Sequence, residues 1–278
     1  MTIRIITDSS CDLPQEIIQE HRITVIPLFI NVGDQSYLDG VDLSRQEFYE
    51  RLPGFRPSPK TAAPGPDVFR KTFEQLASEG ATEILSIHVS TKLSAIVDIA
   101  RTAAKETTRL PVTVFDSRQL SLGTGFQVLA AAEAAARGLA LGEILSLLEE
   151  LIGRIRVFAA LDTMEYLKRS GRVNFAISAL GTLLQIKPFM KMYNGEPTAE
   201  RVRTRKGAMK RLVELLKEHG PYEKVAMLHT HALQRAEALL QEVRSLLPEG
   251  DIWVEEITPV LGAHIGPGVI GFACISRK

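Results

Sequence analysis

The chain has 278 residues, of which 45% are hydrophobic and 24% charged, and its 33 basic and 33 acidic side chains cancel. This composition predicts a globular protein of one large domain or two ordinary ones, and it excludes a disordered chain and a small disulfide-dependent scaffold. The neutral net charge and an aromatic content of only 6% argue against a nucleic-acid partner. Two isolated cysteines, Cys11 and Cys274, favour a reducing, cytoplasmic compartment.

Short β-branched runs alternate with helical patterns over the first ~150 residues, which predicts a mostly parallel α/β sheet. Strands are predicted at residues 3–7, 24–32, 83–88 and 112–115. Helices are predicted to start near Asp12 and Pro14 and to cover 44–52, 65–78, 93–107, 124–137 and 141–154. Ser44 with Glu47 forms a capping box. The apolar stretch 120–136 carries Glu133, so a packed helix is expected there and no membrane span.

The second half mixes hairpins with helices, which predicts an α+β domain. Strands are expected at 156–161, 187–193, 197–203, 224–229, 253–257 and 269–275, and helices at 206–218 and 233–247, with another starting near Asp162. Asn194-Gly195 is a strong hairpin signal. The change of pattern places a boundary at residue 154, which gives an N-terminal domain of residues 1–154 and a C-terminal domain of residues 155–278.

Small polar groups follow several predicted strands, where open α/β sheets bind their ligands. Ser90, Thr91 and Ser94 lie at a strand-to-helix junction, where hydroxyl and backbone N–H groups either receive an anion or cap the helix. The glycine-rich run 262–268 holds His264 and Gly266. It is expected to be a tight loop in which the histidine either binds a ligand or is incidental.

Two further clusters have a functional and a structural interpretation. His229 and His231 have strand spacing, but no Cys or carboxylate cluster stands beside them, so strand-end polar residues are favoured over a metal site. The basic runs 169–172 and 201–206 are either a patch for a phosphate or an acidic partner, or a solvated face.

Taken together, these segments resemble the DegV family of bacterial fatty-acid-binding proteins over nearly the whole chain. The matching motifs are Thr7-Asp8-Ser9-Ser10-Cys11-Asp12-Leu13, Asp39-Gly40-Val41-Asp42-Leu43, Phe48-Tyr49, Thr61 with Pro64, Ser90-Thr91-Lys92-Leu93-Ser94, Asp116-Ser117, Tyr166-Leu167, Gly171-Arg172, Arg203-Thr204-Arg205 and residues 262–268. Their order and spacing make the set specific.

The resemblance implies a two-domain α/β fold with a long apolar tunnel between the domains, which holds a long-chain fatty acid such as palmitate. It implies a carrier without cofactor or catalytic activity, which presents the acid to a separate fatty-acid kinase subunit for acyl-phosphate formation in phospholipid synthesis. The family pattern carries the carboxylate contacts onto Thr61, Ser94 and His264. Secondary ligand or partner contacts are expected at Ser90, Thr91, Arg172, Arg203, Arg205 and Gly266.

The sequence departs from the family pattern at two places beside the expected head group. The family usually has Gly-Thr after Leu-Ser, where this chain has Ala95-Ile96, and a serine often follows the binding threonine, where this chain has Ala62. Both changes make the surroundings of the head group more apolar.

Other classes of function stay open at this point. Ser94 or Ser90 with His264 and Asp8 would be the residue types of a hydrolase triad, although the chain has no G-x-S-x-G elbow. The arginine clusters would suit a sensor of a phosphate-bearing ligand. A nucleotide-dependent transferase is disfavoured because no P-loop is present.

Overall fold

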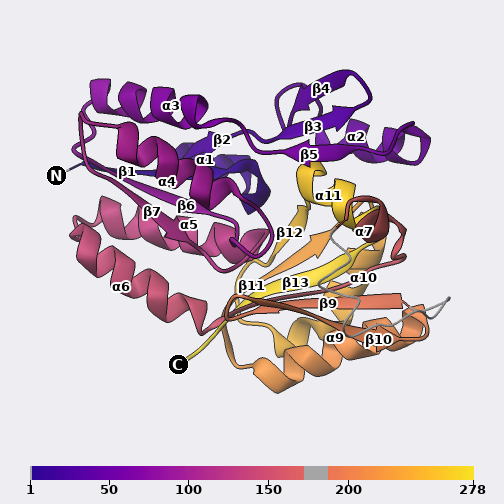
Figure 1. Cartoon of the computed structure of the whole chain (residues 1–278). Helices are drawn as coiled ribbons and strands as arrows, with labels where there is room; N and C mark the ends of the chain where they lie inside the picture. Colours follow the sequence, from indigo (N-terminus) through magenta and orange to yellow (C-terminus); the bar gives the residue numbers. More distant parts are fainter. Residues whose placement is uncertain (1, 172–186) are drawn as a thin grey trace.

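The computed structural model describes residues 2–171 and 187–278. Its elements stack in layers, with an N-terminal sheet and a C-terminal sheet separated by a pair of helices (Figure 1). Further helices cover the outer faces of both sheets, and a small third sheet stands beside the N-terminal one. The fold is thus α/β, with a parallel-sheet part followed by an α+β part, as predicted.

The N-terminal sheet is wholly parallel, with strand order β2-β1-β6-β7. Its strands are β1 (Ile3–Asp8), β2 (Thr24–Ile26), β6 (Glu83–His88) and β7 (Val112–Asp116). The neighbouring helices are α1 (Gln15–Glu20), α3 (Pro66–Ser78), α4 (Ile96–Glu106), α5 (Leu122–Ala136) and α6 (Leu141–Ile152). The buried side chains of α3 and α4 join one core cluster and those of α5 and α6 another, because successive strand residues point to opposite faces.

The prediction of one strand over residues 24–32 is wrong. β2 ends at Ile26, and β3 (Phe29–Val32) belongs to a separate antiparallel sheet with order β4-β3-β5. Pro27 lies between them and has no N–H to donate to a sheet ladder, so the chain leaves the first sheet there. The short strands β4 (Gln35–Leu38) and β5 (Lys60–Ala62) were not predicted. α2 (Arg45–Arg51), capped by Ser44 as predicted, and η2 (Leu52–Gly54) connect them.

The C-terminal sheet has six strands in the order β10-β9-β8-β13-β11-β12, and only its β11–β12 pair is parallel. The strands are β8 (Ile155–Ala160), β9 (Lys187–Tyr193), β10 (Glu196–Val202), β11 (Tyr222–His229), β12 (Trp253–Glu256) and β13 (Ile270–Ser276). The helices of this half are α7 (Glu165–Arg169), α9 (Arg205–His219), α10 (Leu233–Val243) with η3 (Arg244–Leu246), and α11 (Pro259–Ile265). The predicted hairpin is confirmed at Asn194 and Gly195, which both have positive φ.

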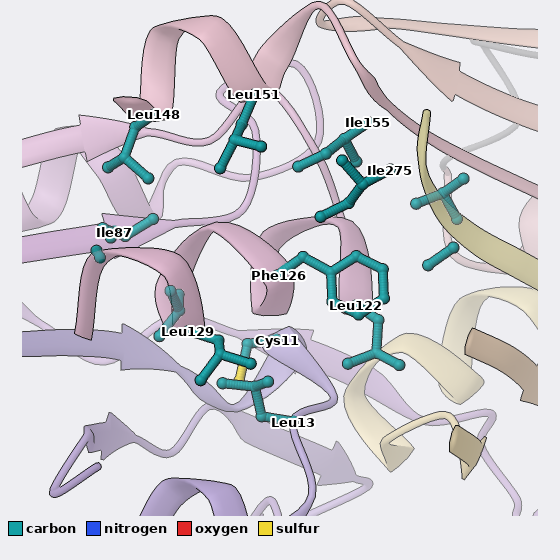
Figure 2. Close-up of a cluster of buried hydrophobic side chains, with 14 of the residues drawn as sticks. Cys11, Leu13, Ile87, Leu122, Phe126, Leu129, Leu148, Leu151, Ile155 and Ile275 are labelled. Carbon is teal, nitrogen blue, oxygen red and sulfur yellow. The ribbon is translucent and has the colours of Figure 1, made fainter. Parts of the chain in front are cut away.

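The central layer of α5 and α6 is shared by both halves of the chain. Figure 2 shows Phe126 and Leu151 from these helices gathered with Cys11 from the N-terminal half and with Ile155 and Ile275 from the C-terminal half. α5 is buried on nearly all sides, which explains why its sequence is apolar throughout. The predicted division at residue 154 stays a prediction, because one continuous core crosses that position.

Within the two described ranges, no helix has both the length and the apolar character that crossing a bilayer requires.

Candidate functional site

A cavity with a volume of about 340 Å³ lies between the two halves of the chain. Its walls are mostly apolar side chains, and they come from both halves. Examples are Leu28, Val89, Leu93, Leu120, Val157, Leu161, Met190, Met192, Leu228, Ile257 and Leu261. A mostly apolar cavity with few polar groups is typical of a site for an apolar ligand.

The three residues predicted to hold a carboxylate are all found in this wall. Thr61, Ser94 and His264 all line the cavity and are half-buried. Thr61 lies on β5, where it pairs with Ile30 of β3. Its hydroxyl is 2.8 Å from Nε2 of His264. Strand pairing therefore fixes the threonine from one side while the histidine meets it from the other half of the chain.

The expectation that His264 lies in a glycine-rich loop is wrong. His264 is in the last turn of α11, which begins after the N-cap residue Thr258 with Pro259 at its first position. Gly266 ends the helix with φ +75°, and a Cβ at this residue would lie 2.2 Å from the ring of Tyr166. The sequence therefore needs glycine at this position both for its backbone angle and for its close contact with the ring.

Ser94 lies in the turn between β6 and α4, which starts at Ile96 rather than at residue 93 as predicted. Its backbone N–H donates to the Ser90 carbonyl at 3.1 Å, and its Oγ accepts the Ile96 N–H at 3.3 Å. A hydroxyl that accepts one hydrogen bond still has its own proton to donate. Ser94 is therefore able to cap the helix and to donate into the cavity at once.

The other hydroxyls of this turn lie outside the cavity lining. Ser90 is buried, and its Oγ accepts the Lys92 N–H at 3.3 Å. Thr91 is exposed and donates from its Oγ1 to Asp116 at 2.7 Å. Neither hydroxyl caps α4, because the Ser90 contact lies in the turn before this helix begins and the Thr91 contact is to the end of β7.

The predicted basic positions have different surroundings. Arg203 is exposed just after β10. Arg205 donates to both oxygens of Asp162, with distances of 3.2 and 2.8 Å, and Arg235 reaches the same carboxylate at 3.4 Å. Asp162 directly follows Leu161, which lines the cavity. Arg172 lies outside the described residues.

The structure argues against a hydrolase triad, because Asp8, its proposed acid, is bound to another histidine. Asp8 is fully buried, with Oδ2 2.9 Å from Nδ1 of His88, and its Oδ1 accepts from the hydroxyl of Ser10. Burial raises the pKa of Asp8, but the hydrogen bond and charge of His88 and the hydrogen bonds from Ser10 outweigh it and hold the pKa below its ordinary value. Asp8 therefore orients His88, so it does not complete a triad with Ser94 and His264.

Sequence reasoning assigned no site role to three buried polar side chains, two of which line the cavity. Ser10 and Ser121 line its wall, and both donate to buried carboxylates, Ser10 to Asp8 and Ser121 to Asp12. His88 was also missed, although its position two residues after Ser86 on one strand was a signal that both share a face. Nε2 of His88 is 2.7 Å from Oγ of Ser86.

The fold and the cavity define a class, namely a two-part α/β protein with an apolar ligand site between its halves. A family model described as "Uncharacterised protein, DegV family" matches residues 2–277, and the chain belongs to this DegV family. A DegV domain-containing protein of Streptomyces coelicolor is 35% identical over 280 residues, which are 99% of each chain. Protein DegV of Bacillus subtilis is 30% identical and covers 98% of each chain.

Two solved structures are similar over their whole length. A DegV family protein from Thermus thermophilus, whose structure is described as fatty-acid-binding, has a TM-score of 0.88 and 33% identity, with 100% of both chains covered. DegV from Bacillus subtilis, described as a fatty acid binding protein, has a TM-score of 0.89 and 28% identity, with 99% of this chain and 100% of that chain covered. These relatives bind fatty acids.

Proposed function

We propose that this protein binds a long-chain fatty acid such as palmitate in the cavity, with the carboxylate hydrogen-bonded by Thr61, Ser94 and His264. The observation that carries the proposal is the Thr61–His264 pair, whose Oγ1 and Nε2 atoms are 2.8 Å apart in the wall of a mostly apolar cavity. A fatty acid has the same division into one polar end and an apolar chain. The relatives that bind fatty acids share the whole fold.

The energetics support such a ligand. Burying about 15 methylene groups at roughly 0.8 kcal/mol each gives on the order of 12 kcal/mol before the costs of association. A buried carboxylate needs donors in place of the lost water. Two hydroxyls and an imidazole supply these donors without a full ion pair, so the carboxylate is bound but can still be released.

We further propose that the protein presents the carboxylate to a partner fatty-acid kinase and performs no chemistry itself. Support comes from the alanines that depart from the family pattern, because Ala62 and Ala95 both line the cavity and are exposed. The polar end is thus open to solvent, where a second protein can reach it. A carrier of this kind needs a ligand whose reactive end stays accessible.

Native mass spectrometry after gentle purification tests the binding proposal. The expected result is a mass increase equal to one fatty acid, which solvent extraction removes. A phosphate-bearing adduct in its place would support the sensor instead. Labelling of a serine by a fluorophosphonate probe would contradict the non-catalytic part of the proposal, since a carrier has no activated nucleophile.

A further inference from the structure

Two serines in the mostly apolar wall of the cavity have hydroxyl protons that are already in use. Ser10 and Ser121 both line the cavity, and they are only 2% and 1% exposed. Oγ of Ser10 donates to Oδ1 of Asp8, and Oγ of Ser121 donates to Oδ2 of Asp12. A hydroxyl that donates its one proton keeps two lone pairs with which its oxygen can accept. Each serine is therefore an acceptor in the cavity wall.

A buried chain of polar groups sets the direction of the Ser10 hydrogen bond. Oγ of Ser86 is 2.7 Å from Nε2 of His88, and Nδ1 of His88 is 2.9 Å from Oδ2 of Asp8. Burial raises the pKa of Asp8, but His88 and Ser10 hold it below its ordinary value, so Asp8 is ionised at neutral pH. A carboxylate can only accept hydrogen bonds. The Ser10 hydroxyl must therefore donate to Asp8, and its oxygen is left as an acceptor.

Ser121 has an unusual backbone conformation, with φ +53° and ψ −144°, in a region that favours glycine. It is the N-cap residue of α5, yet its side chain accepts no hydrogen bond from the first turn of that helix. Within residues 2–171 and 187–278, no group donates to the hydroxyl oxygen of either Ser10 or Ser121. The cavity wall thus contains two buried acceptors that the described part of the chain does not supply with donors.

Both acceptors lie at the sheet edge where the carboxylate is expected to bind. Ser10, Ser94 and Ser121 follow β1, β6 and β7, which are adjacent parallel strands with β6 in the middle. Neighbouring strands are about 4.8 Å apart, and the carboxyl ends of parallel strands meet at one edge of a sheet. A ligand that is hydrogen-bonded to Ser94 is therefore held between the segments that carry the two acceptors.

We propose that Ser10 and Ser121 are specificity-determining residues that make the cavity select a fatty acid with a hydroxyl group on its chain, which donates to one of the two serine oxygens. This inference rests on the proposed function, because it names a subclass of the same ligand. A hydroxyl supplies the donor that these acceptors need, whereas a plain acyl chain leaves both unpaired. A hydroxyl elsewhere on the chain is buried without a partner and weakens binding. The position of the hydroxyl therefore decides the affinity.

The alternative interpretation is that both serines only supply donors to the buried carboxylates of Asp8 and Asp12. In that case a hydroxyl on the acyl chain weakens binding at every position, because it loses water and gains no partner. Replacing either serine then has the same effect on the binding of every acid. A dependence on hydroxyl position that disappears in a serine variant separates the two interpretations.

The experiment measures the affinity for palmitate and for a series of monohydroxypalmitates in which the hydroxyl moves along the chain. In the wild type, one position or two neighbouring positions should bind at least as tightly as palmitate, and the others about ten- to hundredfold more weakly. Ser10→Ala or Ser121→Ala should weaken binding of the favoured isomer about tenfold and leave palmitate binding unchanged. Ser94→Ala is the matched control, because it removes a contact to the carboxylate that all these acids share and should leave their ratios unchanged.

The outcomes separate this inference from the proposed function. If palmitate binds and every hydroxy isomer binds more weakly, or if both serine variants keep the wild-type ratios, the inference is overturned and the proposed function stands. If neither palmitate nor any isomer binds, the proposed function fails and the inference fails with it. Ser10→Ala keeps the backbone N–H that donates to Asp8 at 3.0 Å, so this carboxylate stays bound. If either variant does not fold, the other variant and the wild-type position profile decide.

Discussion

Thr61 and His264 are 203 positions apart in the sequence, yet Oγ1 of the one lies 2.8 Å from Nε2 of the other. The first is on β5 of the small sheet, and the second is on α11, which directly precedes the central strand β13. The pair therefore connects the N-terminal and C-terminal halves of the chain in the wall of the cavity. Any ligand group that hydrogen-bonds to both residues also joins the two halves of the protein.

Thr61→Val and Ser94→Ala should each weaken fatty-acid binding with little loss of stability. Each removes one donor to a buried carboxylate and keeps most of the side-chain volume. An unsatisfied buried acceptor costs about 1–3 kcal/mol, so the affinity should fall roughly ten- to hundredfold. Titration calorimetry with palmitate measures the loss. Thr102→Val, at an exposed threonine on α4, is the control, and equal affinity in all three variants would remove Thr61 and Ser94 from the site.

His264→Ala should lower acyl affinity and also loosen the two segments that meet at this residue. Its imidazole is the part of α11 that reaches Thr61, so its loss breaks the link between β5 and the helix. Hydrogen exchange of residues 63–70 and 265–271, measured with and without fatty acid, checks the second effect. If the ligand protects both segments equally in the wild type and the variant, the histidine does not link the halves.

Arg203→Ala and Arg205→Ala should impair acyl-phosphate formation with a fatty-acid kinase more than they impair acid binding. Exposed charges at an interface act mainly on encounter and orientation, so added salt should weaken turnover in the same way. The side chain of Arg205 is more restricted than that of Arg203, because its guanidinium is bound to Asp162. Lys210→Ala, an exposed change on the same helix α9, is the control. Wild-type turnover in both arginine variants would leave the patch as a solvated face.

Asp39→Asn should change how stability depends on pH. An aspartate in the unfolded chain has a pKa near 3.8, whereas burial raises the pKa of Asp39 in the folded protein to about 7. The folded protein thus holds an extra proton between these values, so the contribution of Asp39 to stability is full below pH 4 and is lost as the pH rises through 7. The difference between these two pKa values corresponds to roughly 4 kcal/mol in the free energy of unfolding.

The Asn variant stays neutral, so its stability relative to the wild type should increase as the pH rises from 5 to 8. Urea unfolding at several pH values measures this difference. A constant difference over that range would show that Asp39 does not titrate there.

Local patterns were sufficient to predict most elements of the fold. The alternation of strands and helices, the helix cap at Ser44 and the turn at Asn194-Gly195 each act over a few residues, and each is confirmed. The strand at 24–32 was wrong because Pro27, within that range, has no N–H to donate to a sheet ladder. The loop at 262–268 was wrong because α11 begins at contacts with residues that are distant in sequence. Their positions after predicted strands indicated Ser94 and His264 as candidates from the residues alone, and the family resemblance grouped them with Thr61 as carboxylate contacts.

The sequence by itself determined the α/β class, the apolar periodicity of the helices and the separate sheet patterns of the two halves, because these depend on contacts between near neighbours in the chain. Only the tertiary structure decided that His264 lies on a helix, that Asp8 pairs with His88, and that Asp12 accepts from the N-cap residue of α11. Each of these contacts joins residues about 80 to 250 positions apart. Such contacts form only when packing of the core brings the segments together, and no local pattern records them.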